Sequence, residues 1–178
     1  MGETDAVARP SSRERILDTF EQVLLDDGAG SATLDAVAER AGISKGGLIY
    51  HFPSKAALLA GLVERLMTRV DEIVAAAPDE PAELIRWYLS YDPSDPVELA
   101  VWRSLLAAIH VVDDGLAQAI SDAFVRFTRP LAVLDPFLAE QVRLIGDGLY
   151  LNALVGAPPP SPEHLERIIV DLTERLGR

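Results

Sequence analysis

Apolar residues recur at helical spacing along most of the chain. One stripe occupies residues 16–24, a second occupies residues 58–74, and a third occupies residues 165–176. Each stripe follows the i, i+3, i+4, i+7 rule of a helix that buries one face. Because no segment shows sustained alternation of apolar and polar residues, we predict an all-α protein without a sheet.

Prolines and capping residues divide this pattern into separate helices. Proline is well tolerated in the first turn of a helix but costs ~3 kcal/mol in its interior. Ser11 with Glu14 forms a capping box, and Gly28 and Gly30 are placed to end the helix that follows. We predict nine helices, near residues 11–27, 34–41, 45–51, 54–77, 80–91, 96–111, 114–129, 136–155 and 162–176.

Composition narrows the possible functions. The 178 residues include 28 acidic and 16 basic side chains, which gives a net charge of −12. This charge excludes a nonspecific DNA coat, which takes its affinity from neutralising phosphates, and disfavours contact with an anionic membrane. The absence of cysteine excludes disulfides and thiolate catalysis. No apolar run approaches the ~20 residues of a membrane span, so we expect a soluble, cytoplasmic protein without a membrane partner.

Two short predicted helices, 34–41 and 45–51, are joined by a turn that contains Gly42. Thr33 is placed to cap the first helix and Ser44 to cap the second, which is typical of a helix-turn-helix. The 24 residues that begin at Arg40 contain no aspartate or glutamate, so the basic groups among them form a local positive patch. Such a patch is sufficient for DNA contact where the geometry places it on the phosphates.

Gly46 and Gly47 lie inside the second short helix, where each costs ~1 kcal/mol relative to alanine. One explanation is functional: a large partner approaches the backbone closely. The alternative is that the two glycines form a turn and that no recognition helix exists.

The segment from residue 33 to residue 59, TLDAVAERAGISKGGLIYHFPSKAALL, resembles the DNA-binding domain of TetR-family transcriptional regulators. The resemblance extends over residues 11–77 and rests on the spacing of Gly42, Ser44, Gly46, Tyr50, Phe52, Lys55 and Leu58. It implies an all-helical homodimer whose C-terminal half binds a small effector. The expected organisation is a tail (1–10), a DNA-binding domain (11–53), a connecting helix (54–77), and an effector-binding and dimerisation domain (78–178).

The resemblance also implies roles for individual residues. The expected DNA contacts, to phosphates or along the major groove, come from Thr33, Ser44, Lys45, Gly47, Tyr50, His51 and Lys55. The chain departs from the family pattern at Gly47, where a hydroxyl residue is common, and at Ile49, where a phosphate-binding tyrosine is frequent. For Tyr50 the alternative is a core aromatic beneath the connecting helix.

The C-terminal half holds both tryptophans and most of the tyrosines. Ordinary helical core explains most of these rings, but a cavity between helices is the usual ligand site of a bundle. The candidate effector-binding residues are Trp87, Tyr91, Trp102, His110 and Phe127. Because basic groups are scarce, a neutral or cationic apolar compound fits better than a multiply charged anion.

The two last predicted helices each carry an apolar row. The candidate dimerisation residues are Leu138, Val142, Ile145, Leu149, Leu165, Ile168, Ile169 and Leu172, with Gly146 and Gly148 permitting close helix approach. Two such helices from each subunit would form an isologous four-helix interface. Alternatively, both rows cover only the core of their own subunit.

A ligand-responsive repressor of a palindromic operator is the function that these features favour. The turn from Gly42 to Gly46 matches the G-x-S-x-G pattern of hydrolases, but no strand precedes it, so Ser44 is expected to be a cap. His110 with Asp113 or Asp114 lacks the further ligands that a zinc site needs, so we expect no metal, no cofactor and no catalysis. The alternatives are a helical ligand-binding protein or enzyme with a vestigial helix-turn-helix, and a DNA-binding protein without an effector.

Overall fold

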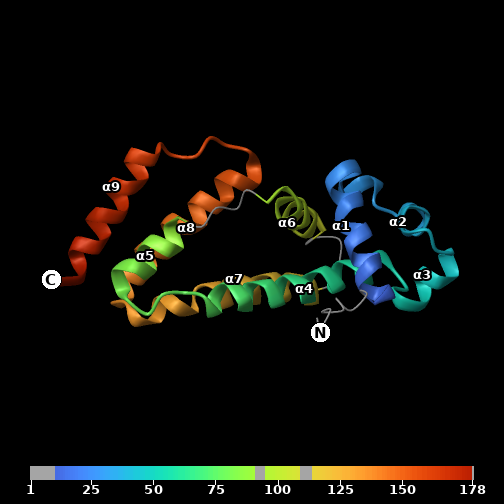
Figure 1. Cartoon of the computed structure of the whole chain (residues 1–178), viewed down its shortest axis with the longest axis horizontal. Helices are drawn as coiled ribbons and strands as arrows, with labels where there is room; N and C mark the ends of the chain where they lie inside the picture. Colours follow the sequence, from blue (N-terminus) through green and yellow to red (C-terminus); the bar gives the residue numbers. More distant parts are fainter. Residues whose placement is uncertain (1–10, 91–94, 109–113, 178) are drawn as a thin grey trace, which may run out of the picture. The chain divides into compact units, whose positions relative to one another are not determined.

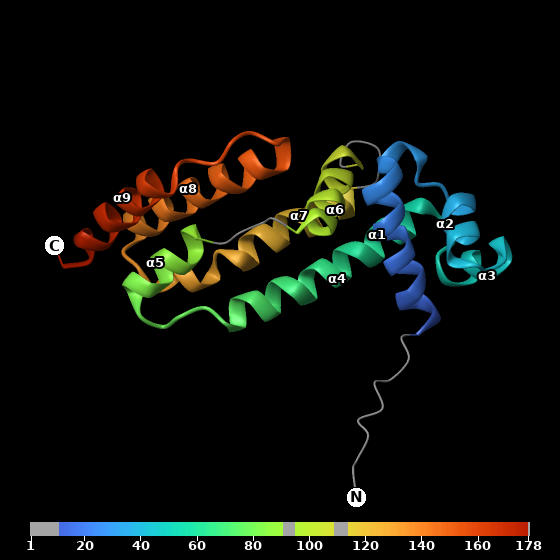
Figure 2. The same cartoon turned by 45° about the horizontal axis from the view of Figure 1, so that its top comes forward.

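The computed structural model describes residues 11–90, 95–108 and 114–177, and all regular structure in these ranges is helical. The elements are α1 (Ser12–Ser31), α2 (Leu34–Ala41), α3 (Lys45–His51), α4 (Lys55–Ala75), α5 (Pro81–Leu89), α6 (Pro96–Ala108), α7 (Asp114–Phe127), η1 (Arg129–Val133), α8 (Pro136–Val155), α9 (Pro162–Thr173) and η2 (Glu174–Gly177) (Figures 1 and 2). The predicted all-α class is confirmed. Among the described residues, no helix is long and apolar enough to cross a membrane.

Capping chemistry explains most helix boundaries. Ser11, Asp135 and Ser161 each accept backbone N–H bonds at the start of α1, α8 and α9. Gly28 interrupts α1 with φ 75°, as its sequence position predicts, but a short helical stretch continues to Ser31. The final helix is shorter than expected, because α9 gives way to the 3-10 turn η2 after Thr173.

The chain divides into two compact units, one up to Leu62 and the other from Val63 onward. The division falls inside α4, which is one uninterrupted helix from Lys55 to Ala75. The connecting helix expected from the sequence therefore contributes its first two turns to one unit and the remainder to the other.

The first unit has a core contributed by all four of its helices. Apolar residues from α1, α2, α3 and the beginning of α4 are buried together with Phe52, which ends α3. These buried residues are Ile16, Leu17, Phe20, Val23, Leu24, Val37, Ala38, Leu48, Phe52, Leu58, Leu59 and Leu62. The core holds α2 and α3 by few side chains, so most of both short helices is open to solvent.

In the second unit, α5 packs against α8, α9 and η1. Their shared core contains Leu84, Ile85, Tyr88, Leu89, Leu131, Leu134, Leu138, Val142, Ile169 and Leu172. Polar links join the same elements. The Arg86 guanidinium donates to both oxygens of Glu166, at 2.5 and 2.8 Å, and so connects α5 to α9.

Candidate functional site

The helix-turn-helix is built from local capping interactions. The Thr33 hydroxyl oxygen accepts from the Ala36 N–H at 3.2 Å, and the Ser44 hydroxyl oxygen accepts from the Gly47 N–H at 3.1 Å. Between them, Gly42 ends α2 in the left-handed conformation, with φ 67° and ψ 33°. A β-carbon is disfavoured there, so the turn that the sequence predicts depends on this glycine.

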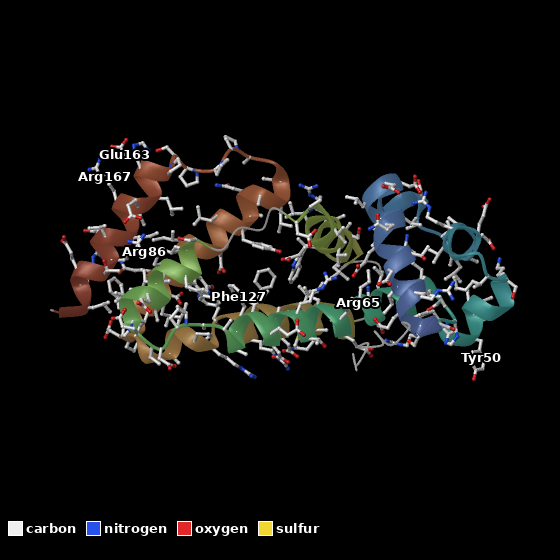
Figure 3. The ribbon with its side chains drawn as sticks, viewed as in Figure 1. Tyr50, Arg65, Arg86, Phe127, Glu163 and Arg167 are labelled. Carbon is white, nitrogen blue, oxygen red and sulfur yellow. The ribbon has the colours of Figure 1, made fainter. Side chains whose placement is uncertain are left out.

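Helix α3 presents most of its surface to solvent. Leu48 is its buried anchor, at 0% exposure, whereas Ile49 is 40% exposed and Tyr50 is 85% exposed. Figure 3 shows the Tyr50 side chain projecting away from the helix. The alternative in which Tyr50 is a core aromatic is therefore wrong. Gly46 and Gly47 lie inside a regular helix, which overturns the alternative in which they replace it with a turn.

Two basic side chains of the helix-turn-helix, Lys45 and Arg40, form ion pairs with carboxylates of the same unit. Lys45 lies 2.9 Å from an oxygen of Asp35, and Arg40 pairs with Asp26 and Asp27 at 2.8 and 2.9 Å. These pairs are exposed, so each contributes little to stability. The positive patch read from the sequence is thus partly neutralised by carboxylates that lie outside its segment.

The remaining candidate DNA contacts occupy different surroundings. Lys55, at the start of α4, is half-buried, and its ammonium donates to the Ala29 carbonyl at 2.5 Å. His51 is also half-buried and meets the Tyr50 ring edge to face, with ring centroids 5.1 Å apart. Thr33, Ser44 and Gly47 are exposed at the ends of the two short helices.

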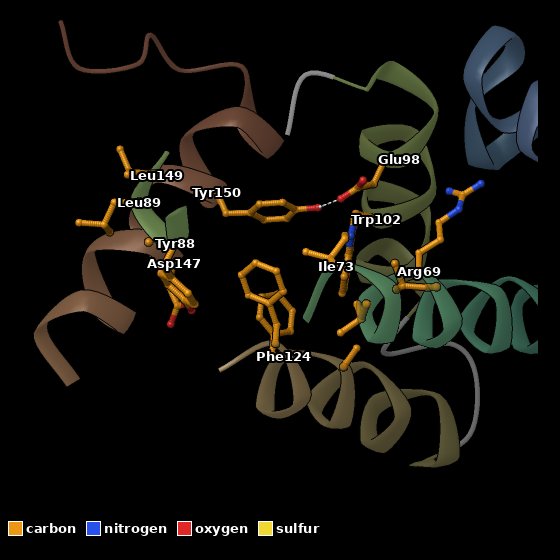
Figure 4. A pocket seen from close by; sticks show the side chains of 15 residues that line it. Arg69, Ile73, Tyr88, Leu89, Glu98, Trp102, Phe124, Asp147, Leu149 and Tyr150 are labelled. Atoms are coloured by element: carbon orange, nitrogen blue, oxygen red, sulfur yellow. Dashed lines mark hydrogen bonds between the residues drawn. The ribbon is translucent and has the colours of Figure 1, made fainter. Parts of the chain in front are cut away.

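A cavity of about 70 Å³ lies within the second unit (Figure 4). Its walls come from the part of α4 after Leu62 and from α5, α6, α7 and α8. The lining residues are Leu66, Arg69, Val70, Ile73, Tyr88, Leu89, Glu98, Trp102, Ala123, Phe124, Phe127, Gly146, Asp147, Leu149 and Tyr150. It is a largely apolar cavity between helices, the kind of place where the sequence predicts that an effector binds.

The candidate effector residues are only partly brought together. Trp102 and Phe127 line the cavity. Trp87 is not among the lining residues, but its ring stacks on Phe127 with centroids 5.9 Å apart. Tyr91 and His110 lie outside the described residues.

The sequence interpretation passed over several lining residues with polar groups. Glu98 precedes Trp102 by four positions, and Asp147 precedes Tyr150 by three. Residues at these separations share a helix face, so the spacing is a signal that could have linked each carboxylate to its aromatic neighbour. Phe124 and Phe127 are related by the same spacing.

Hydrogen bonds and ion pairs organise the polar side of the cavity. The Tyr150 hydroxyl donates to Glu98 Oε1 at 2.8 Å, as Figure 4 shows. Asp147 pairs with Arg143 at 2.8 Å, and burial raises the pKa of its carboxyl. Burial also raises the pKa of the Tyr88 hydroxyl far above its usual range, and the charge of Asp147 adds to this shift. The phenol of Tyr88 therefore stays neutral at physiological pH.

The apolar rows expected to form a dimer belong mainly to the core of their own subunit. Leu138, Val142, Ile169 and Leu172 are buried in the α5–α8–α9 core, and Ile145, Leu149 and Leu165 pack against it, whereas Ile168 is 37% exposed. These rows lie on helix faces that pack against α5. All of their side chains except Ile168 therefore belong to the core of their own subunit, which is the alternative that the sequence left open.

A different face of α8 carries exposed apolar side chains. Phe137, Leu144, Leu151 and Val155 are 73, 56, 56 and 69% exposed. Their spacing of seven, seven and four residues places them along one side of the helix. Gly148 lies on the same stripe with open space around it, whereas Gly146 faces inward against the Tyr88 ring.

Family models match both halves of the chain. One described as "Bacterial regulatory proteins, tetR family" matches residues 16–62, and one described as "Tetracyclin repressor-like, C-terminal domain" matches residues 82–177. The second match alone covers more than half of the chain. The matched ranges include the helix-turn-helix and all of the cavity-lining residues after α4.

Individual proteins show the same likeness at different lengths. The regulator EthR of Mycobacterium tuberculosis is 35% identical over 82 residues, so the match spans 44% of this chain but only 38% of that relative. The repressor KstR of Mycobacterium tuberculosis is 26% identical over 174 residues, which covers 96% of this chain and 71% of that protein. Both carry the description HTH-type in their names.

Solved structures share the fold. The multidrug binding protein EbrR in complex with malachite green superposes with a TM-score of 0.70 at 24% identity, covering 92% of this chain and 98% of that one. The TetR-family member SCO1917 from Streptomyces coelicolor gives a TM-score of 0.73 at 23% identity, with coverage of 92% and 98%. At these identities the likeness establishes the fold alone.

Proposed function

Because the chain belongs to the TetR family of bacterial regulatory proteins, we propose that it is a cytoplasmic, ligand-responsive repressor of a palindromic operator. The observation that carries this proposal is the exposed face of α3. A seven-residue helix held by the single buried side chain of Leu48 leaves Tyr50 85% exposed, with two glycines on the same open surface. Such a face suits insertion into a major groove.

The proposed DNA contacts combine positioning and recognition. Lys45 and the backbone around Gly47 would meet the groove at the start of α3, and Tyr50 would lie along it. Thr33 and Ser44 would donate their hydroxyl protons to phosphates while their oxygens continue to accept the capping bonds. Contacts of this kind set the register of a protein on the duplex.

A second copy of the chain would complete the operator-binding species. The exposed stripe on α8 supplies an apolar seam, and Gly148 allows a partner helix to approach closely. A symmetric pairing of this stripe would give the dimer two copies of α3, one for each half-site, and the half-sites of such operators lie ~34–36 Å or a multiple apart. In this proposal the exposed stripe on α8 forms the dimer interface in place of the buried rows of α8 and α9. Ile168, the exposed member of those rows, would lie at the edge of the interface.

The effector would bind in the cavity of the second unit and act through α4. This helix carries Lys55 at its start and the lining residues Leu66, Val70 and Ile73 further along. A ligand that favours one arrangement of α4 would change operator affinity, and DNA would change ligand affinity by the same factor. Among similar proteins, KstR is named a repressor, and EbrR is known in complex with a small ligand.

Titration of the full chain against duplexes from the gene's own upstream region tests the proposal. We expect salt-dependent, sequence-specific binding with two protein chains per operator, measured by fluorescence anisotropy and sedimentation. Tyr50→Ala should weaken this binding at least about tenfold, consistent with loss of a central contact.

Val125→Ala is the matched control, because Val125 is a 60% exposed apolar residue on α7. Its operator affinity should equal that of the unmodified chain. Binding that is insensitive to sequence, or an equal loss in both variants, would contradict the assignment of α3 as the recognition helix.

A further inference from the structure

The cavity of the second unit has an aromatic wall on three helices. Trp102 from α6, Phe124 from α7 and Tyr150 from α8 approach one another, with the Trp102 ring 5.0 Å from Phe124 and 6.1 Å from Tyr150 between centroids. Their planes are inclined by 53° and 79° to the tryptophan ring. All three rings also line the cavity, and aromatic faces that border a cavity bind organic cations favourably.

A carboxylate borders the same rings. Glu98 lies one helical turn before Trp102 on α6, lines the cavity, and accepts the Tyr150 hydroxyl at 2.8 Å. Figure 4 shows this hydrogen bond reaching across the cavity from α8 to α6. The acceptor is therefore positioned beside the aromatic wall, and its orientation is fixed by one of the rings.

The cavity lining contains two other charged residues, Asp147 and Arg69. Asp147 pairs with Arg143, which also pairs with Glu140. Arg69 contributes to the lining, but Figure 4 shows its guanidinium extending away from Tyr150 and the rings. The charge nearest the aromatic wall is consequently negative, which disfavours an anionic ligand.

We propose that this cavity binds a compact organic cation, a quaternary ammonium or protonated amine carried on a single aromatic ring. The cationic group lies over the faces of Trp102 and Tyr150 and against Glu98, while the ring of the ligand packs between Phe124 and Phe127. The small size of the cavity favours a one-ring ligand over a larger one. This inference rests on the proposed function in one respect, namely that the ligand of the cavity is the effector. It adds the chemical class of that ligand.

A pair of probes with the same shape tests the charge requirement. Benzyltrimethylammonium and its neutral carbon isostere, neopentylbenzene, differ in the central nitrogen and its charge. Binding to the full chain without DNA is followed by tryptophan fluorescence, since Trp102 lines the cavity and Trp87 stacks on the lining residue Phe127. We expect the cation to bind at least about tenfold more tightly than the isostere.

Glu98→Gln isolates the carboxylate, because the amide oxygen can still accept the Tyr150 hydroxyl. This variant should lose at least about tenfold in affinity for the cation and change by less than about twofold for the isostere. Glu163→Gln removes the same charge from the exposed start of α9, labelled in Figure 3, and should leave both affinities unchanged.

Equal affinity for the two probes, failure of the cation to bind at millimolar concentration, or a cation affinity unaffected by Glu98→Gln would each overturn the proposal. Tyr150→Phe adds a second readout: it removes the hydroxyl that occupies Glu98 and should preserve or increase cation binding. A tenfold loss in this variant would also contradict the assigned geometry. Because no DNA is present, failure here leaves operator binding untouched, and failure to bind an operator leaves this result intact.

Discussion

The two units of the chain position their functional residues by different means. In the first unit, the caps Thr33 and Ser44, the turn glycine Gly42 and the anchor Leu48 lie close together in the sequence. In the second, the cavity is lined by five helices between Leu66 and Tyr150. A site made from local backbone chemistry can be identified directly in a sequence, whereas a site made from distant side chains depends on how the helices pack.

Truncation of the anchor of α3 should have the largest effect and should separate the two units. Leu48→Ala removes a fully buried side chain, so we expect a loss of ~2–5 kcal/mol in the free energy of unfolding of the first unit. Operator binding should disappear, while the cavity of the second unit keeps its ligand. Denaturant unfolding followed by circular dichroism, together with both binding assays, measures this contrast.

Ile49→Ala is the control for that substitution, because Ile49 is the 40% exposed neighbour of Leu48. Its unfolding free energy should change by less than about 0.5 kcal/mol. Similar destabilisation by both substitutions would show that α3 is not held by one anchor.

A methyl group at Gly146 should disturb the second unit through the Tyr88 ring. An added β-carbon would lie 2.4 Å from Tyr88 Cε1, so the ring must move or α8 must shift. We expect Gly146→Ala to destabilise the fold by ~1–3 kcal/mol and to weaken ligand binding, since Tyr88 lines the cavity.

Gly148→Ala provides the comparison, because nothing lies within 4 Å of the added carbon. At concentrations that keep the chain monomeric, thermal unfolding should show no loss of stability, whereas sedimentation should show weaker self-association. If both substitutions destabilise the monomer equally, the close contact between Gly146 and Tyr88 does not limit packing.

The opposite outcome is expected for a glycine of α3. The β-carbon that Gly46→Ala adds has no atom within 4 Å. The better helix propensity of alanine should therefore raise the unfolding free energy by ~0.5–1 kcal/mol. Operator binding should nevertheless weaken, because the methyl group stands on the face proposed to approach DNA. Parallel unfolding and anisotropy titrations test this, and a gain in both properties would argue against close backbone approach.

The smallest expected effect concerns the ion pair between Asp35 and Lys45. This pair is exposed and worth ~0.2–1 kcal/mol, so Asp35→Asn should hardly alter stability. It should raise DNA affinity up to about fivefold, because Lys45 no longer has to leave a carboxylate before it meets a phosphate. Anisotropy at two salt concentrations, with operator and unrelated duplexes, measures the change.

Glu163→Gln makes the same change in net charge on α9 and serves as the control for Asp35→Asn. Equal gains in DNA affinity from the two substitutions would mean that total charge, and not release of Lys45, is responsible.

Charge illustrates how far composition can mislead about a local surface. Residues 1–55 contain 6 basic and 9 acidic side chains, and residues 56–178 contain 10 and 19, so most of the acidic excess lies outside the helix-turn-helix. In the structure, acidic residues that precede the cations of the helix-turn-helix in the sequence form ion pairs with those cations. Asp26 and Asp27 meet Arg40, and Asp35 meets Lys45.

The amino-acid sequence by itself determined the helical class, most helix boundaries and the helix-turn-helix. Apolar period, proline position and capping side chains act over one or two turns, so their consequences do not depend on distant residues. The family-specific spacing around Gly42 and Ser44 belongs to the same local information. These features predicted α2, α3 and α8 at the bounds that the structure has.

Only the tertiary structure decided which faces of the later helices are buried and which side chains share the cavity. An apolar row on α8 or α9 serves equally well for a core or for a partner, and the packing of α5 selected the core. In the same way, Glu98 and Tyr150 become neighbours because α6 and α8 converge. Helical spacing determines which residues share a face, but long-range packing determines which residues that face contacts.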